Sequence, residues 1–202
     1  STVMDRDEKI TRLTLSLSQF FPELHGDKVT FIGSTFMRYG SSEVYQNHCI
    51  VLGDCASIPS VTPAPIIETY ATEREVLLAW TRLVQREDPD IVTGYNIFSF
   101  DYEFMFGRAK ELDCVEEFLV LSRMKGKVCG NQVRGEYQIE KSCMKLANGN
   151  NNLNFIIMPG RIQVDMYYWL LRTENLGSYT LDSVGSHFLG DKVKRLSHEF
   201  DA

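Results

Sequence analysis

Long apolar runs are absent from this 202-residue sequence, and none approaches the roughly 20 residues that a membrane-spanning helix needs. The first residues also lack the basic start and the apolar core of a secretory signal peptide. We therefore expect neither a membrane protein nor a secreted one, and a cytosolic or nuclear setting follows by default.

Cysteine is sparse and irregularly spaced. The five cysteines are odd in number and never occur in C-x-x-C spacing, so the sequence indicates neither a disulfide framework nor a zinc site. The four histidines share no metal-ligand spacing either. We expect reduced and mostly buried thiols at Cys49, Cys55, Cys114, Cys129 and Cys143.

Basic residues are also fewer than acidic ones. The chain has 21 Lys and Arg against 27 Asp and Glu, which gives a formal net charge of −6. This balance argues against a protein that wraps duplex DNA through bulk electrostatics, because that mode of binding needs clustered basic residues. It does not exclude a nuclease, since a site that holds metal ions with carboxylates is itself acidic.

The order of the expected elements indicates one α/β domain. Thr72 and Glu75 form a capping-box pattern that starts a helix reaching Asp88. A short apolar strand then ends at Gly94, and a helix follows from about Asp101. The other expected elements are an amphipathic helix within 1–26, antiparallel strands over 27–39 and 45–52, an extended connection over 58–66, a strand over 160–165, and helices from 166 and over 181–189.

Residues 126–158 differ in composition from the rest of the chain. They are rich in Gly and Asn and contain two short β-like runs around a polar NGNNN segment. This pattern predicts a β-hairpin that leaves the main sheet, with residues 148–152 at its exposed tip.

The stretch DPDIVTGYNIFSFD over residues 88–101 carries the expected chemistry. A carboxylate in the first turn of a helix stands on a rigid element, is favoured by the positive end of the helix dipole and is a hard oxygen ligand for Mg²⁺. Asp101 is therefore the candidate catalytic residue and metal ligand. The alternative interpretation is that Asp101 is only a helix cap.

This stretch resembles the second exonuclease motif of family B DNA polymerases. The resemblance to the delta-type enzymes extends to three further segments in the same order: ITRLTLSLSQFFPELHGDKVTFIGSTFMRYG, the ERE-LLAW helix, and GRIQVDMYYWLLRTENLGSYTLDSVGSHFLG. The helix within 1–26 resembles insertions in polymerases of large eukaryotic DNA viruses. The nucleus or a virus replication site is the setting that this family implies.

The resemblance implies a ribonuclease H-like 3′→5′ exonuclease domain over residues 1–202, with an inserted β-hairpin. In such domains two Mg²⁺ ions about 4 Å apart activate water and stabilise the leaving oxygen. Asn96 is then expected to hold the strand-to-helix turn or to approach the DNA, and Phe100 to pack beneath the site or against a base of the single-stranded primer 3′ end. The implied partners are DNA, the remaining polymerase domains, and a sliding clamp or accessory subunits.

Two acidic motifs of the family are missing from this sequence. The only D-x-E lies at residues 101–103, inside the second motif, and no tyrosine has an aspartate four residues later. The palm-domain aspartate motifs are absent as well. We therefore expect a domain that is truncated at both ends and inactive alone. Asp165 is interpreted as structural rather than as a metal ligand, and the aromatic residues Tyr167, Tyr168 and Trp169 as core.

Two other functions stay open. A free-standing 3′→5′ DNA exonuclease of the same superfamily would need its own D-x-E and Y-x-x-x-D. A non-catalytic module that binds DNA or a replication partner on a degenerate exonuclease fold would need neither.

Overall fold

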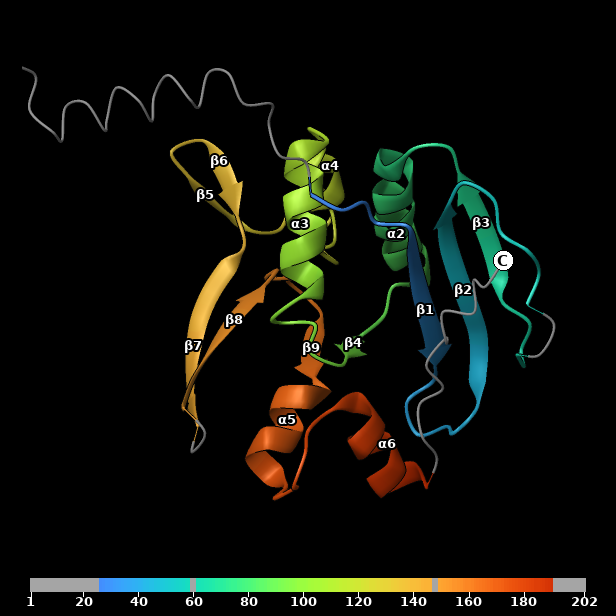
Figure 1. Ribbon diagram of the computed structural model, residues 1–202. Coiled ribbons are helices and arrows are strands. Elements are labelled where there is room, and N and C mark those ends of the chain that lie inside the picture. The colour runs from blue at the N-terminus through green and yellow to red at the C-terminus, as the bar shows by residue number, and fades with distance from the viewer. Residues whose placement is uncertain (1–25, 59–60, 147–148, 191–202) are drawn as a thin grey trace, which may run out of the picture.

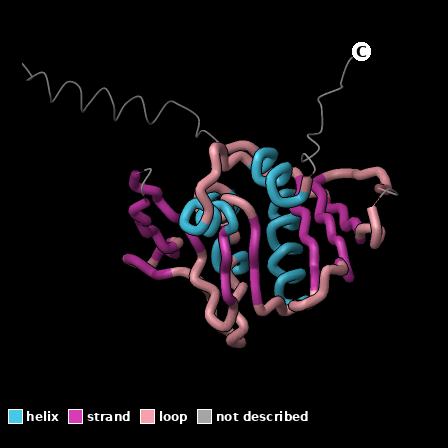
Figure 2. The backbone as a smooth tube through the Cα atoms, turned by 90° about the horizontal axis from the view of Figure 1, so that it is seen from below, coloured by secondary structure: helices cyan, strands magenta, loops and turns pink. Residues whose placement is uncertain are grey.

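The computed structural model describes residues 26–58, 61–146 and 149–190 (Figure 1). The helix predicted within residues 1–26 lies outside the described residues, except for Gly26. In the views of Figures 1 and 2, a group of hairpin strands lies at one side of the molecule and a three-stranded sheet at the other, with helices between them.

The three-stranded sheet has the order β1-β2-β3. Strands β1 (Phe31–Met37) and β2 (Val44–Leu52) pair antiparallel, as the alternating pattern predicts. Strand β3 (Ile66–Tyr70) pairs parallel with β2 and was not predicted. The Ile-Ile pair at its start directly follows a proline-rich stretch. The prolines indicated an extended connection there, so the short strand was not predicted.

A second sheet contains β4 (Ile91–Gly94) and β9 (Ile162–Asp165), which pair parallel with Gly94 opposite Asp165. Within the described ranges, β1 pairs only with β2 and β4 pairs only with β9. The structure therefore has two separate sheets here instead of the single main sheet that the sequence predicted.

Helix α2 (Glu73–Glu87) begins at the predicted capping box. The Thr72 hydroxyl accepts from the Glu75 N–H at 3.3 Å, and the Glu75 carboxylate accepts from the Thr72 N–H at 3.0 Å. The apolar face of α2 packs against α3 (Asp101–Glu111), α4 (Val115–Phe118) and the three-stranded sheet. This core fixes where α3 begins. Its fully buried members include Ile50, Val76, Leu77, Leu83, Tyr102 and Phe118.

Residues 126–158 form two antiparallel pairs rather than one hairpin. The first joins β5 (Asn131–Val133) to β6 (Glu136–Gln138), and the second joins β7 (Glu140–Leu146) to β8 (Gly149–Phe155). The predicted tip is also wrong in part, because residues 149–152 belong to β8 and only 147–148 separate its strands. The asparagines there pair across the hairpin, although their low strand propensity suggested a loop.

The chain continues after β9 into α5 (Met166–Thr173) and α6 (Leu181–Leu189), in the positions that the sequence predicted. Among the described residues, no helix combines the length and apolar character needed to cross a bilayer. The cysteines are unpaired. Cys114 and Cys129 are buried, Cys49 and Cys55 are partly buried, and Cys143 is exposed. The prediction that most of the thiols are buried was therefore wrong.

Candidate functional site

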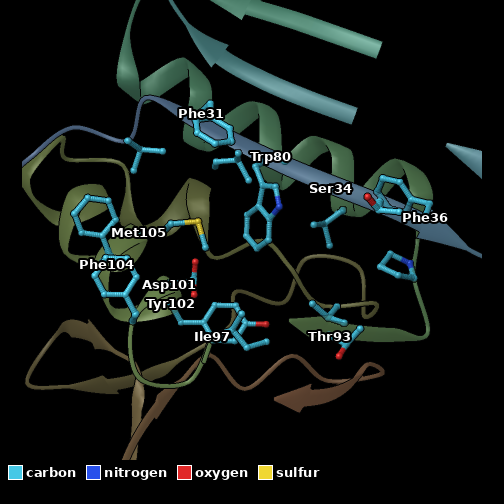
Figure 3. A pocket seen from close by; sticks show the side chains of 18 of the residues that line it. Phe31, Ser34, Phe36, Trp80, Thr93, Ile97, Asp101, Tyr102, Phe104 and Met105 are labelled. Carbon is cyan, nitrogen blue, oxygen red and sulfur yellow. The ribbon is translucent and has the colours of Figure 1, made fainter. Parts of the chain in front are cut away.

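A cavity of about 700 Å³ lies between β1 and the segment that joins β4 to α3 (Figure 3). Residues 28–37 form one wall, and Pro89 and residues 91–93 form another. Trp80 and Val84 of α2 and the first turn of α3 complete the lining. The cavity is therefore assembled from segments that are far apart in the sequence.

Asp101 is the first residue of α3, and its half-buried side chain points into this cavity (Figure 3). The N-cap of α3 is Phe100, which makes no side-chain capping hydrogen bond. Asp101 therefore lies one residue inside the helix, and the alternative that it is the N-cap is wrong. A carboxylate in this position faces the positive end of the helix dipole.

The surroundings raise the pKa of Asp101 above its ordinary value. Burial is the largest cause, the negative charge of Asp165 adds to it, and a hydrogen bond from the backbone of Asp101 itself opposes it. The folded state therefore disfavours the ionised form. A cation in the cavity would reverse this balance, because an opposite charge nearby favours the carboxylate.

Asn96 shapes the turn before α3. It adopts a left-handed backbone conformation with φ of 63°, which Asn tolerates better than most residues. Its carbonyl oxygen accepts the N–H groups of Ser99 and Phe100, both at 3.2 Å. Of the two roles expected for Asn96, the turn is the one with contacts in the structure.

Phe100 is 60% exposed and lines the cavity. Its ring stacks on Phe104, with centroids 5.6 Å apart and planes inclined by 8°. An exposed and supported aromatic ring next to a carboxylate is a surface on which a base can stack.

Asp165 lies at the end of β9 and is only 3% exposed. Its carboxylate accepts backbone N–H groups, as described below, and lines no part of the cavity. Among the aromatic residues that follow, Tyr168 is buried as predicted, whereas Tyr167 is half-buried and Trp169 is 48% exposed. The core prediction was therefore wrong for Trp169, which lines an open pocket together with residues of α6.

Within the described ranges, no group of three or more His, Cys, Asp or Glu side chains could hold a metal ion. Asp101 is the carboxylate that lines the cavity. It fits a metal in its chemistry and position, but it supplies one ligand of the several that a two-ion site needs.

Sequence reasoning overlooked Tyr102, which is 2% exposed and lines the cavity. Its hydroxyl has no hydrogen-bond partner among the described residues. Burial, together with the charges of Asp101 and Asp165, raises its pKa strongly. A tyrosine in a helix is usually assigned to the core, so no sequence signal identified its hydroxyl as a cavity group.

We expect Tyr102→Phe to leave the 202-residue chain equally stable or to stabilise it by up to about 1 kcal/mol, because a buried hydroxyl without a partner carries a desolvation penalty. Urea unfolding measures this. Tyr179→Phe is the matched control, since the Tyr179 hydroxyl donates to the Glu174 carbonyl at 2.7 Å and accepts from the Leu176 N–H at 3.1 Å. It should cost about 1 kcal/mol. A similar loss in Tyr102→Phe would mean that the hydroxyl has a partner.

A mixed α/β fold with an acidic residue at a helix start, beside a large cavity, is consistent with the class of exonuclease domains. Residues 10–184 match the sequence model of the family described as DNA polymerase family B, exonuclease domain. The chain belongs to this family, as the motif over residues 88–101 indicated.

The similar proteins are viral and delta-type DNA polymerases. The chain is 42% identical over 200 residues to a DNA polymerase of Phaeocystis pouchetii virus, covering 95% of this chain and 19% of that protein. It is 39% identical to a DNA polymerase of Pyramimonas orientalis virus, covering 92% and 14%. It is 34% identical to the DNA polymerase delta catalytic subunit of Bos taurus, covering 88% and 15%. The chain thus spans less than a fifth of each relative, and the predicted delta-type and viral resemblance is confirmed.

Proposed function

We propose that the chain forms part of the 3′→5′ proofreading exonuclease domain of a DNA-directed DNA polymerase, and that Asp101 is one of its metal ligands. The observation that carries this proposal is the position of Asp101, whose side chain points into the 700 Å³ cavity from the first turn of α3. Membership of the family B exonuclease family supports the assignment.

A ribonuclease H-like fold would explain why the cavity is so large. Strands β1 and β4 both line it, and in the described part of the chain neither has a strand partner beyond β2 and β9 respectively. One more strand between them would join the two sheets into one. If that strand carried the missing D-x-E motif, its carboxylates would come close to Asp101. The hydroxyl of Tyr102 would then have a polar neighbour.

Asp101 would hold Mg²⁺ together with carboxylates from other parts of the complete protein. Two bound Mg²⁺ ions would supply an activated water and charge stabilisation for phosphodiester hydrolysis. Asn96 holds the turn that presents Asp101, and Phe100 offers a ring for a base of the frayed primer end. The β-strands over 131–155 would be the insertion expected from the family.

The remaining parts of the proposal concern the complete protein. Template-directed DNA synthesis would reside in other polymerase domains, with a sliding clamp or accessory subunits as further partners. Its setting would be the nucleus or a virus replication site, as for the viral and delta-type relatives. Neither alternative, a free-standing exonuclease or a non-catalytic module, has an observation of its own in its favour.

A direct test compares the complete protein with the 202-residue chain on an end-labelled single-stranded oligonucleotide in Mg²⁺. We expect the complete protein to shorten the 3′ end and the 202-residue chain to show no shortening, because Asp101 and its neighbours cannot hold two ions. EDTA controls for metal dependence. Shortening by the short chain that disappears in Asp101→Ala would mean that other residues of this chain complete the site.

A further inference from the structure

Asp165 is a buried carboxylate that contacts the turn before α3. It is the last residue of β9 and lies opposite Gly94, the last residue of β4, in the parallel pair. Strands β4 and β9 lie side by side (Figure 1), and the Asp165 side chain reaches the backbone that follows β4.

Three backbone N–H groups converge on the Asp165 carboxylate. Oδ1 accepts from Asn96 at 2.8 Å and from Tyr167 at 2.9 Å, and Oδ2 accepts from Phe98 at 2.8 Å. The bond from Tyr167 caps α5, whereas the other two hold alternate residues of the turn. Hydrogen bonds to a carboxylate are stronger than those between neutral groups.

Other contacts also reach this turn: the Asn154 N–H donates to the Phe98 carbonyl at 2.5 Å, and the Ser99 hydroxyl donates to the Asn152 carbonyl at 3.3 Å. The Asn96 carbonyl accepts from Ser99 and Phe100, and Phe100, the N-cap, offers no side-chain bond to the helix. The packing is also tight, since a Cβ on Gly94 would lie 2.5 Å from Cγ2 of Ile97. The Asp165 carboxylate, which is distant in sequence, is therefore the charged acceptor that holds the Asn96 and Phe98 N–H groups of a turn without a side-chain cap.

We infer that Asp165 is a positioning residue for the proposed exonuclease site, because it fixes the turn over residues 96–100 and thereby the direction in which Asp101 enters the cavity. This inference rests on the proposed function, in which Asp101 binds metal. Asp165 itself holds no reacting group, since its oxygens are directed at the backbone.

The test uses the complete protein with Asp165→Asn, which keeps the shape of the side chain but replaces one accepting oxygen with a donor. We expect the amide of Asn96 or of Phe98 to exchange hydrogen at least about 10-fold faster, because one of these N–H groups then faces a donor in place of its acceptor. We expect excision to slow by about 10-fold or more and to need a higher Mg²⁺ concentration. Primer extension should be unchanged.

Two further variants keep the test decisive. Thr72→Ala removes the cap of α2, far from the turn, and should change neither exchange of residues 96–98 nor excision. In Gly94→Ala the new Cβ would clash with Ile97 of the same turn, while the Asp165 carboxylate stays unchanged. This variant should displace the turn and slow excision, and it can be measured even if Asp165→Asn fails to fold.

Two results would overturn the inference: unchanged exchange in the turn, or excision in Asp165→Asn and Gly94→Ala equal to that of Thr72→Ala. If exchange in the turn is unchanged and excision is lost completely, the first of these results would mean that Asp165 acts as a ligand. The proposed function is tested separately: if Asp101→Ala still excised the primer end, Asp101 would not be a metal ligand, whatever the results for Asp165.

Discussion

In the complete protein, Asp101→Ala is expected to slow 3′→5′ excision by about 100-fold or more, a loss of roughly 2.7 kcal/mol of transition-state stabilisation. Removing one carboxylate displaces a metal ion from the site that the cavity would hold. Extension of a matched primer should be unaffected, because synthesis would take place in other domains. At a 3′ mismatch the variant should stall or misextend.

Excision of a labelled mismatched primer, measured beside extension, checks this expectation. Glu103→Ala is the matched control, since Glu103 lies two residues further along α3 and its carboxylate accepts from Asn154 of β8 at 2.8 Å. It is the other acidic residue of the only D-x-E in the chain, yet it does not line the cavity. An excision rate for Asp101→Ala within a factor of a few of the wild type would remove Asp101 from the site.

The free energy of unfolding of Asp101→Asn, measured against pH, tests whether burial disfavours the Asp101 carboxylate. The raised pKa of Asp101 means that the folded state binds its proton more tightly than the unfolded state does. Its stabilising contribution is therefore full below the ordinary Asp pKa and is lost as the pH rises through the folded pKa. In the absence of metal, Asp101→Asn should gain stability at neutral pH relative to the wild type, and the gain should shrink in acid. Equal stability of the two chains at neutral pH would contradict the expectation that burial disfavours the Asp101 carboxylate.

The elements that the sequence predicted correctly carry local signals. The capping box at Thr72 and Glu75 begins α2, and the apolar run that ends at Gly94 forms β4. Pairing between strands depends on segments far apart in the chain, and there the sequence was weaker. It missed β3, and it expected one hairpin where the structure has two pairs.

The candidate site shows the same difference between local sequence signals and contacts that are distant in sequence. Asp101 became a candidate because its motif is contiguous in the sequence. The buried hydroxyl of Tyr102, which has no partner among the described residues, becomes visible only in the cavity that β1, α2 and α3 line. Asp165 was interpreted as a structural residue, and in the structure its carboxylate accepts backbone N–H groups. What the sequence could not give is the target of its carboxylate, which is a backbone turn 67 to 69 residues earlier in the chain.

A buried ion pair joins the helices around the cavity to the segment that leads into β1. Arg108 of α3 donates to both carboxylate oxygens of Glu73 in α2, at 2.7 and 2.6 Å, and these side chains are 6% and 4% exposed. Glu73 also accepts from the Val29 N–H at 2.8 Å, and Arg108 donates to the Gly26 carbonyl at 2.9 Å. Burial alone would raise the pKa of Glu73, but these hydrogen bonds outweigh it and the pKa is lowered. The contribution of Glu73 is therefore present above the ordinary Glu pKa and is lost in acid.

Arg108→Met should accordingly destabilise the fold by about 3 to 5 kcal/mol at neutral pH, because it leaves a buried carboxylate without its counter-charge. The deficit should shrink as the pH falls and Glu73 takes up a proton. Adding Glu73→Gln to Arg108→Met should recover part of the loss, since the buried position 73 then carries no unpaired charge. Arg74→Met, which breaks the exposed Arg74–Glu117 pair, should cost less than about 1 kcal/mol. Urea unfolding across pH compares the four chains. If Arg108→Met behaved like Arg74→Met, the Glu73–Arg108 pair would not be what holds the β1 wall of the cavity to α2 and α3.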